Sequence, residues 1–151
     1  MIVAEIGSGL YNLLFLGHIV TILVAFAPAV IHPVMAQQAR SDGPAAMSSL
    51  AAKMATNSTR LHLPALVLTG GFGLGMVLVS DEAWGFDQAW ISLAFLVWIA
   101  LCGVVSAVIM PAERKLAAGD LEAEKKVAMG GQISTVLLLV MLYLMIWKPG
   151  L

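Results

Sequence analysis

Three histidines stand inside or at the edge of long apolar stretches, where an ionisable side chain is able to do chemistry. His18 lies within the first stretch, His32 lies near the end of that stretch, and His62 lies near the start of the second. A neutral imidazole can bind haem iron, copper or zinc, and it can also relay protons. An ionisable residue inside a membrane span is a functional candidate by default. These three residues are therefore the candidate cofactor-binding side chains of the chain.

The spacing of the polar residues places them on one face of each expected helix. At about 100° per residue, positions seven or fourteen apart return to nearly the same face of a helix. Tyr11, His18 and His32 therefore form one stripe, and His62 and Thr69 align in the same way on the second stretch. The other two apolar stretches also carry a face of polar or small residues. This pattern predicts four helices that pack with these faces inward.

The positions of the histidines define two separate candidate sites. His32 and His62 lie at the same depth in the membrane, so the two imidazoles could clamp a haem edge-on. His18 lies about 21 Å from His32 along a helix, so these two residues cannot share one metal ion. We choose His18 as the ligand of a haem iron, with haem b as the expected cofactor. The apolar stretches also offer three soft ligands, Met76, Cys102 and Met141. The alternative is that each histidine only forms an interhelical hydrogen bond or, for the pair, meets water or lipid headgroups.

The elements that must position these residues are four apolar stretches, at about 10–35, 61–80, 89–110 and 128–147. None of them contains Asp, Glu, Lys or Arg. About 20 apolar residues in a helix cross the roughly 30 Å of hydrocarbon in a bilayer. Each charge at the centre of such a helix would cost on the order of 2.5–3.5 kcal/mol, so the absence of charge is informative. The stretches are too long for the strands of a membrane barrel, and they lack the alternation that such strands need.

The overall composition supports the same interpretation. The 151 residues are 60% hydrophobic and only 11% charged, whereas a soluble domain is about 25% charged. We therefore expect an all-α, antiparallel four-helix transmembrane bundle that forms a single domain over residues 1–151.

The basic residues indicate how the bundle is oriented in the membrane. Seven of the eight Lys and Arg residues lie between the first and second stretches or between the third and fourth. The positive-inside rule places both of these loops in the cytoplasm and both termini outside. Lys148 is the exception. A lysine at the end of a span can extend its aliphatic side chain so that the ammonium group reaches the membrane interface. The opposite side carries an aromatic belt that comprises Tyr11, Trp84, Trp90 and Trp147.

The two basic loops should be partly helical. In the first, Ser41 or Asp42 can cap a helix and Pro44 can occupy its first turn. In the second, residues 112–126 carry mixed charges at helical spacing, interrupted at Gly119. We expect this segment to be a solvated extension of the spans.

Several classes of function receive no support from the residues. The sequence offers no acyl-transfer triad, no carboxylate pair and no cluster of cysteines or histidines, and its single cysteine rules out an internal disulfide. The net charge of −1 gives no reason to expect a nucleic-acid partner. Because no charged residue falls within the spans, a coupled ion transporter is not indicated either.

The chain resembles a bacterial family of predicted four-span integral membrane proteins. The resemblance rests on Leu16–Val20 in the first span, on Arg60 followed by Pro64 and a glycine pair in the second, and on the ending Leu144–Gly150. More distantly, it is similar to the HemJ-type protoporphyrinogen oxidases and to CopD-like membrane proteins. In HemJ-type proteins the histidine of the first span is associated with haem binding and redox chemistry, which the resemblance carries over to His18. It also implies a multi-pass protein of the bacterial cytoplasmic (inner) membrane.

Two main functions therefore remain open at this point, beside metal handling, in which the histidines would bind copper or zinc tightly. The first is a haem- or quinone-linked redox protein that uses His18, with His32 and His62 as a second candidate pair. The second is a non-catalytic accessory subunit of a larger membrane complex of the respiratory type. The bilayer is the expected surrounding in both cases, and a homodimer or a larger membrane complex is the expected assembly.

Overall fold

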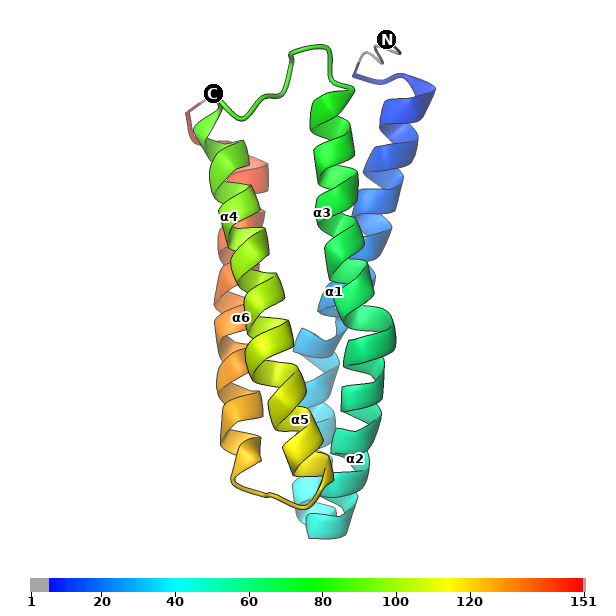
Figure 1. Cartoon of the computed structure of the whole chain (residues 1–151), viewed down its shortest axis with the longest axis vertical. Helices are drawn as coiled ribbons and strands as arrows, with labels where there is room; N and C mark the ends of the chain where they lie inside the picture. Colours follow the sequence, from blue (N-terminus) through cyan, green and yellow to red (C-terminus); the bar gives the residue numbers. More distant parts are fainter. Residues whose placement is uncertain (1–5, 151) are drawn as a thin grey trace.

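Four antiparallel helical rods form one elongated bundle (Figure 1). The computed structural model describes residues 6–150, and within them it contains helices, turns and no strand. The first rod is α1 (Gly9–Asp42) and the fourth is α6 (Ala123–Trp147). The second rod joins α2 (Pro44–Asn57) to α3 (Leu63–Leu78), and the third joins α4 (Ala89–Val104) to α5 (Met110–Ala117). A single wide π-helical turn makes each of these joins, at Ser58–His62 and at Val105–Ile109.

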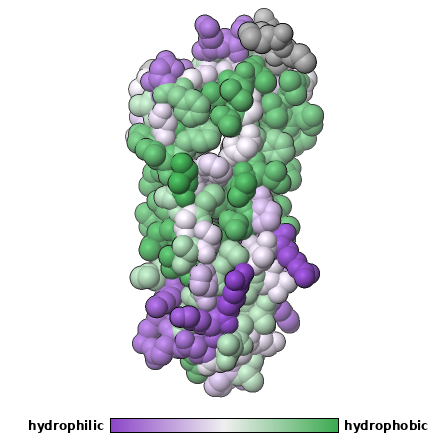
Figure 2. All heavy atoms as spheres, viewed as in Figure 1, coloured by the Kyte–Doolittle hydropathy of each residue, from purple (hydrophilic) through white to green (hydrophobic). Residues whose placement is uncertain are grey.

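The outer surface of the rods identifies the surroundings of the protein. Large apolar side chains lie exposed along all four rods, and Leu23 is 67%, Val30 75% and Leu78 74% exposed. Hydrophobic residues cover the middle of the face shown in Figure 2, and hydrophilic residues gather toward its two ends. All four rods are long and apolar enough to cross a bilayer. An apolar surface of this extent needs lipid to cover it, so the chain is a multi-pass integral membrane protein.

The two ends of the bundle differ in what they carry. The start of α1, the end of α6 and the connection 79–88 lie at one end, which we call the terminal end (Figure 1). The turn at Gly43 and the loop 118–122 lie at the other end; segments 40–60 and 114–126, which include them, contain seven of the eight basic residues, and we call it the basic end. The residues of the expected aromatic belt therefore lie at the end opposite to seven of the eight basic residues, and Lys148 is the exception beside Trp84.

The connection between the first two spans is helical, as expected, but the prediction that Ser41 or Asp42 caps its second helix is wrong. Helix α1 continues through Asp42 and ends at Gly43, whose φ of 98° suits a residue without a Cβ. Ser41 lies inside the last turn of α1, and its hydroxyl donates to the carbonyl of Gln38. Gly43 is thus the N-cap residue of α2, with Pro44 in the first turn as expected.

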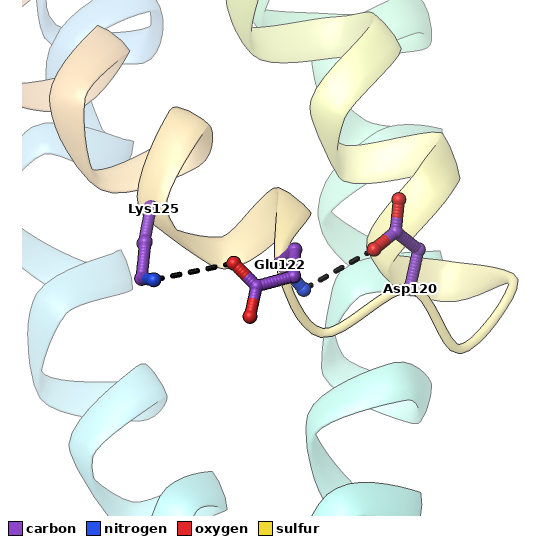
Figure 3. Close-up of polar contacts among 3 residues, drawn as sticks. All are labelled: Asp120, Glu122 and Lys125. Atoms are coloured by element: carbon purple, nitrogen blue, oxygen red, sulfur yellow. Dashed lines mark hydrogen bonds and ion pairs between the residues drawn. The ribbon is translucent and has the colours of Figure 1, made fainter.

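A tight loop connects α5 to α6. Gly119 adopts a φ of 96° there and ends α5, which confirms the expected interruption of this segment. The Asp120 carboxylate accepts the main-chain N–H of Glu122 at 3.2 Å, and Lys125 pairs with Glu122 at 3.2 Å (Figure 3). The side chains of Glu122 and Lys125 are both 83% exposed. These contacts set the start of α6 and leave the loop in water.

The rods pack in pairs and bury two apolar clusters. Helix α1 packs along α3, α4 packs along α6, and α2 packs against α5 at the basic end. The cluster at the basic end is formed by α1, α2, α5 and α6 and includes Met47, Leu50, Ala51, Met54 and Leu116. The cluster at the terminal end comprises Trp90, Ile91, Ala94 and Leu144. Residues of both clusters also line cavities inside the bundle.

Candidate functional site

Two cavities lie one above the other along the bundle axis. The cavity nearer the terminal end has a volume of about 470 Å³ and contains His18; we call it the His18 cavity. The one nearer the basic end has a volume of about 530 Å³ and contains Glu113; we call it the Glu113 cavity. Phe26, Leu66 and Leu101 line both and form the layer between them. Both volumes fall within the roughly 300–1,000 Å³ of pockets that bind small molecules and cofactors.

His18 is buried and is held in one orientation by α3. Its Nδ1 lies 2.9 Å from the main-chain carbonyl oxygen of Thr69. A carbonyl oxygen only accepts, so Nδ1 carries the proton and Nε2 keeps its lone pair. The same edge of the ring faces Gly73, where a Cβ would stand 3.4 Å from the imidazole. Because that edge is occupied by α3, Nε2 is the ring nitrogen left for a ligand in the cavity.

Hydroxyl groups beside His18 tie the two helices together. The Thr69 hydroxyl lies 3.0 Å from the hydroxyl of Thr21 on α1. Thr21 in turn donates to the carbonyls of its own helix, at 2.8 Å to Gly17 and 3.0 Å to His18. This network fixes the position of α1 relative to α3 at the depth of the imidazole, so the orientation of His18 is preset.

The walls of the His18 cavity are mostly apolar and include several aromatic rings. Seven aromatic residues line it: Tyr11, Phe15, Phe26, Trp84, Trp90, Phe95 and Trp98. The Trp98 indole N–H donates to the carbonyl of Leu66 at 2.8 Å, and the Trp84 indole N–H donates to the Tyr11 hydroxyl at 3.1 Å. The ammonium of Lys148 lies 4.3 Å above the Trp84 ring and borders the same cavity. Flat apolar surfaces with a single buried basic nitrogen suit a flat, conjugated molecule.

Two of the soft ligands expected from the sequence share this cavity. Met76 on α3 and Met141 on α6 both line it, whereas Cys102 lines neither cavity. No second histidine reaches the His18 cavity, since His32 and His62 line the other one.

His32 and His62 meet at the depth that the sequence predicts. Their ring centroids are 6.1 Å apart and the rings meet edge to face, at 83°. The Nδ1 atom of His62 lies 2.9 Å from the carbonyl oxygen of Val24, so this nitrogen is also the protonated one. Among residues 6–150, no group of three His, Cys, Asp or Glu side chains could hold a metal ion. The two imidazoles are therefore polar walls of the Glu113 cavity rather than part of a three-ligand centre.

Glu113 is the polar residue that the sequence analysis missed. It belongs to a segment expected to be solvated, yet it is 1% exposed and its Oε2 atom has no hydrogen-bond partner. The Ser58 hydroxyl, from the π turn before α3, is hydrogen-bonded to the Glu113 carboxyl. A signal was present in the sequence, because Ile109, Glu113 and Leu116 repeat at helical spacing and share one face. That face of α5 points to the bundle interior, so the Glu113 carboxyl is buried there.

Both π turns lie against the Glu113 cavity. Ser58 and His62 come from the first turn, and Val105 and Ile109 come from the second. At the second turn the helices approach closely, since a Cβ on Gly130 would stand 2.6 Å from Ile109. Such turns often occur at functional sites because they rotate the side chains that follow them.

Comparison with family models, with curated proteins and with solved structures gives no match to this chain. The geometry of the two cavities therefore carries the functional argument.

Proposed function

We propose that the protein is a membrane redox protein that holds a flat conjugated cofactor, a haem or a quinone, in the His18 cavity. The observation that carries this proposal is the orientation of His18. Its Nδ1 proton is engaged by Thr69, and its Nε2 lone pair is left beside an aromatic cavity of about 470 Å³. The distant resemblance of the segment around His18 to HemJ-type proteins points to the same residue.

The residues present fit either cofactor. For haem b, His18 Nε2 would bind the iron, Met76 and Met141 lie on other helices of the same cavity, and Lys148 would pair with a propionate. For a quinone, the same Nε2 would accept the proton of a quinol hydroxyl. The bound ring would supply the electron transfer in both cases. The chain contributes a preset basic nitrogen, aromatic walls and the exclusion of water.

An absorption spectrum of the protein, extracted gently and recorded before and after dithionite, tests the haem form. A Soret band with sharpened bands on reduction is expected, and it should be lost in His18→Ala. Organic extraction of the same sample, followed by chromatography, tests the quinone form. Retention of the signal in His32→Ala and in His62→Ala would assign the cofactor to the His18 cavity, and the reverse pattern would move it to the other cavity.

The second function expected from the sequence, an accessory subunit, is the competing outcome of this experiment. A featureless spectrum and an extract without quinone, together with stoichiometric co-purification of larger membrane proteins, would favour it over the redox proposal. In that case His18→Ala should leave the activity of those larger proteins unchanged.

We further propose that the protein resides in the bacterial cytoplasmic membrane with its terminal end outside. The clustering of basic residues at one end of the bundle and of aromatic residues at the other supports this orientation. In a Cys102→Ala background, cysteines introduced at Lys125 and at Asp81 should react from opposite sides with an impermeant maleimide. Labelling of both positions from the same side would contradict this orientation.

A further inference from the structure

Several hydrogen-bond acceptors in the Glu113 cavity have no donor. This observation does not depend on the cofactor proposed for the His18 cavity. The Oε2 atom of Glu113 and the Oγ atom of Ser134 are both buried and have no partner. They come from α5 and α6, and both side chains line the same cavity. His62 adds an imidazole that uses Nδ1 in its hydrogen bond to the Val24 carbonyl, which leaves Nε2 as an acceptor. A buried acceptor without a donor is costly, so a ligand that donates would be stabilised here.

The donors around the cavity are already engaged or lie at its rim. Arg40 forms an ion pair with Glu124, so its charge is not free to neutralise Glu113. The Thr135 hydroxyl donates to the carbonyl of Gly131 at 2.9 Å. Gln132 also lines the cavity, but it is exposed. Among the described residues, Glu113 has no ion-pair partner.

The rest of the cavity is apolar. Pro28, Ala29, Leu101, Val105 and Ile109 are among the residues that form its walls. A ligand that fills this volume must therefore combine a hydrophobic body with a group that donates hydrogen bonds. An ionised carboxylate sealed from water also requires a positive charge, because without one it is forced to keep a proton. A divalent metal ion is a poor match, since no three-ligand group is present among residues 6–150.

We infer that the Glu113 cavity binds a lipophilic amine, with the ammonium group donating to Glu113 and Ser134 and the hydrocarbon body lying against the apolar walls. Binding exchanges the proton on Glu113 for the ammonium charge, and that proton leaves to solvent. The other titratable or charged groups that face the cavity are His32, His62, Arg40 and Glu124. Of these, Arg40 and Glu124 neutralise one another, so Glu113 carries the exchange.

The test uses the full chain in lipid nanodiscs and two probes of the same shape, 1-naphthylmethylamine and its neutral analogue 1-naphthylmethanol. Equilibrium dialysis against protein-free nanodiscs removes the contribution of partitioning into lipid. The expected result is saturable binding of the amine at one molecule per chain, with the alcohol bound about tenfold more weakly or worse. Equal binding of the two probes, or no saturable binding of the amine, would overturn the inference.

Variants separate the ionic contact from general packing. Glu113→Gln keeps the shape of the side chain and should weaken amine binding by about tenfold or more, while binding of the alcohol stays unchanged. His18→Ala, in the other cavity, should bind the amine like the wild type. In weakly buffered solution near neutral pH, the wild type should release a proton on binding and Glu113→Gln should not. Amine affinity that survives in Glu113→Gln would refute the assignment, and if that variant does not fold, Ser134→Ala must show the weakened binding instead.

Discussion

The imidazole of His18 donates its Nδ1 proton to the main-chain carbonyl of Thr69, 2.9 Å away and 51 residues later in the chain. This bond joins α1 to α3 inside the membrane and decides which ring nitrogen is basic. It uses a main-chain acceptor, so it does not depend on the identity of the side chain at position 69. The Thr69 hydroxyl contributes separately, through its contact with Thr21.

This distinction yields a first prediction. Thr69→Val removes the hydroxyl but keeps the carbonyl, so the cofactor proposed for the His18 cavity should be retained at near wild-type occupancy. The loss of one hydroxyl contact should cost about 1 kcal/mol in the free energy of unfolding. Cofactor content per chain, measured by absorbance or extraction, checks the first part. If Thr69→Val lost the cofactor as fully as His18→Ala, the carbonyl would not be what orients the ring.

Two neighbouring glycines of α3 should respond oppositely to alanine. A Cβ on Gly70 would stand 2.2 Å from the Trp98 ring, whereas a Cβ on Gly71 would meet nothing within 4 Å. Gly70→Ala must displace a half-buried indole that is also hydrogen-bonded to Leu66, and it should destabilise the bundle by about 1–3 kcal/mol. Gly71→Ala should be neutral or slightly stabilising, because alanine favours a helix. Unfolding in mixed micelles, followed by circular dichroism, compares the pair, and equal effects would contradict this packing.

Replacing Glu113 with leucine should increase stability while abolishing the amine binding inferred above. The Oε2 atom has no partner, so removing the carboxyl relieves a desolvation cost, and the expected gain is on the order of 1 kcal/mol. Ser58 loses its partner but can bond to its own helix, as serines in helices do. Leu116→Ala, three residues later on the same helix, serves as the opposite control. That residue is 2% exposed, and its truncation should cost about 2–5 kcal/mol. A less stable Glu113→Leu protein would show that the carboxyl supports the fold.

The ion pair between Arg40 and Glu124 should contribute little to stability. The Arg40 side chain is 56% exposed and the Glu124 side chain 27%, so water and salt screen their attraction. A double-mutant cycle with Arg40→Ala and Glu124→Ala should give a coupling energy of about 0.2–1 kcal/mol that falls as salt is raised. A coupling energy of several kcal/mol that salt does not change would mean that the pair is sealed from water in the membrane.

The sequence by itself determined the four spans, the all-helical bundle and the inward stripe that carries His18 and His32. These features depend on hydropathy and on the helical period, which are properties of neighbouring residues and need no partner. The meeting of His32 with His62 could also be predicted, because equal depth in a membrane follows from the length of each helix. The cap at Ser41 or Asp42 was wrong because the helix propensity of the preceding residues carried α1 up to the first glycine.

Only the tertiary structure decided the rest. The protonated nitrogen of His18, the position of Trp98 against Gly70 and the layer that divides the two cavities all depend on segments far apart in the chain. The burial of Glu113 depends on them as well. Arg114 and Lys115 follow it directly, so composition alone places it in water, although its helical spacing from Ile109 and Leu116 indicates a shared face. The wide turn before α5 and the close approach of α6 put that face of the helix inside the bundle, where the carboxyl is sealed by residues that no local pattern could identify.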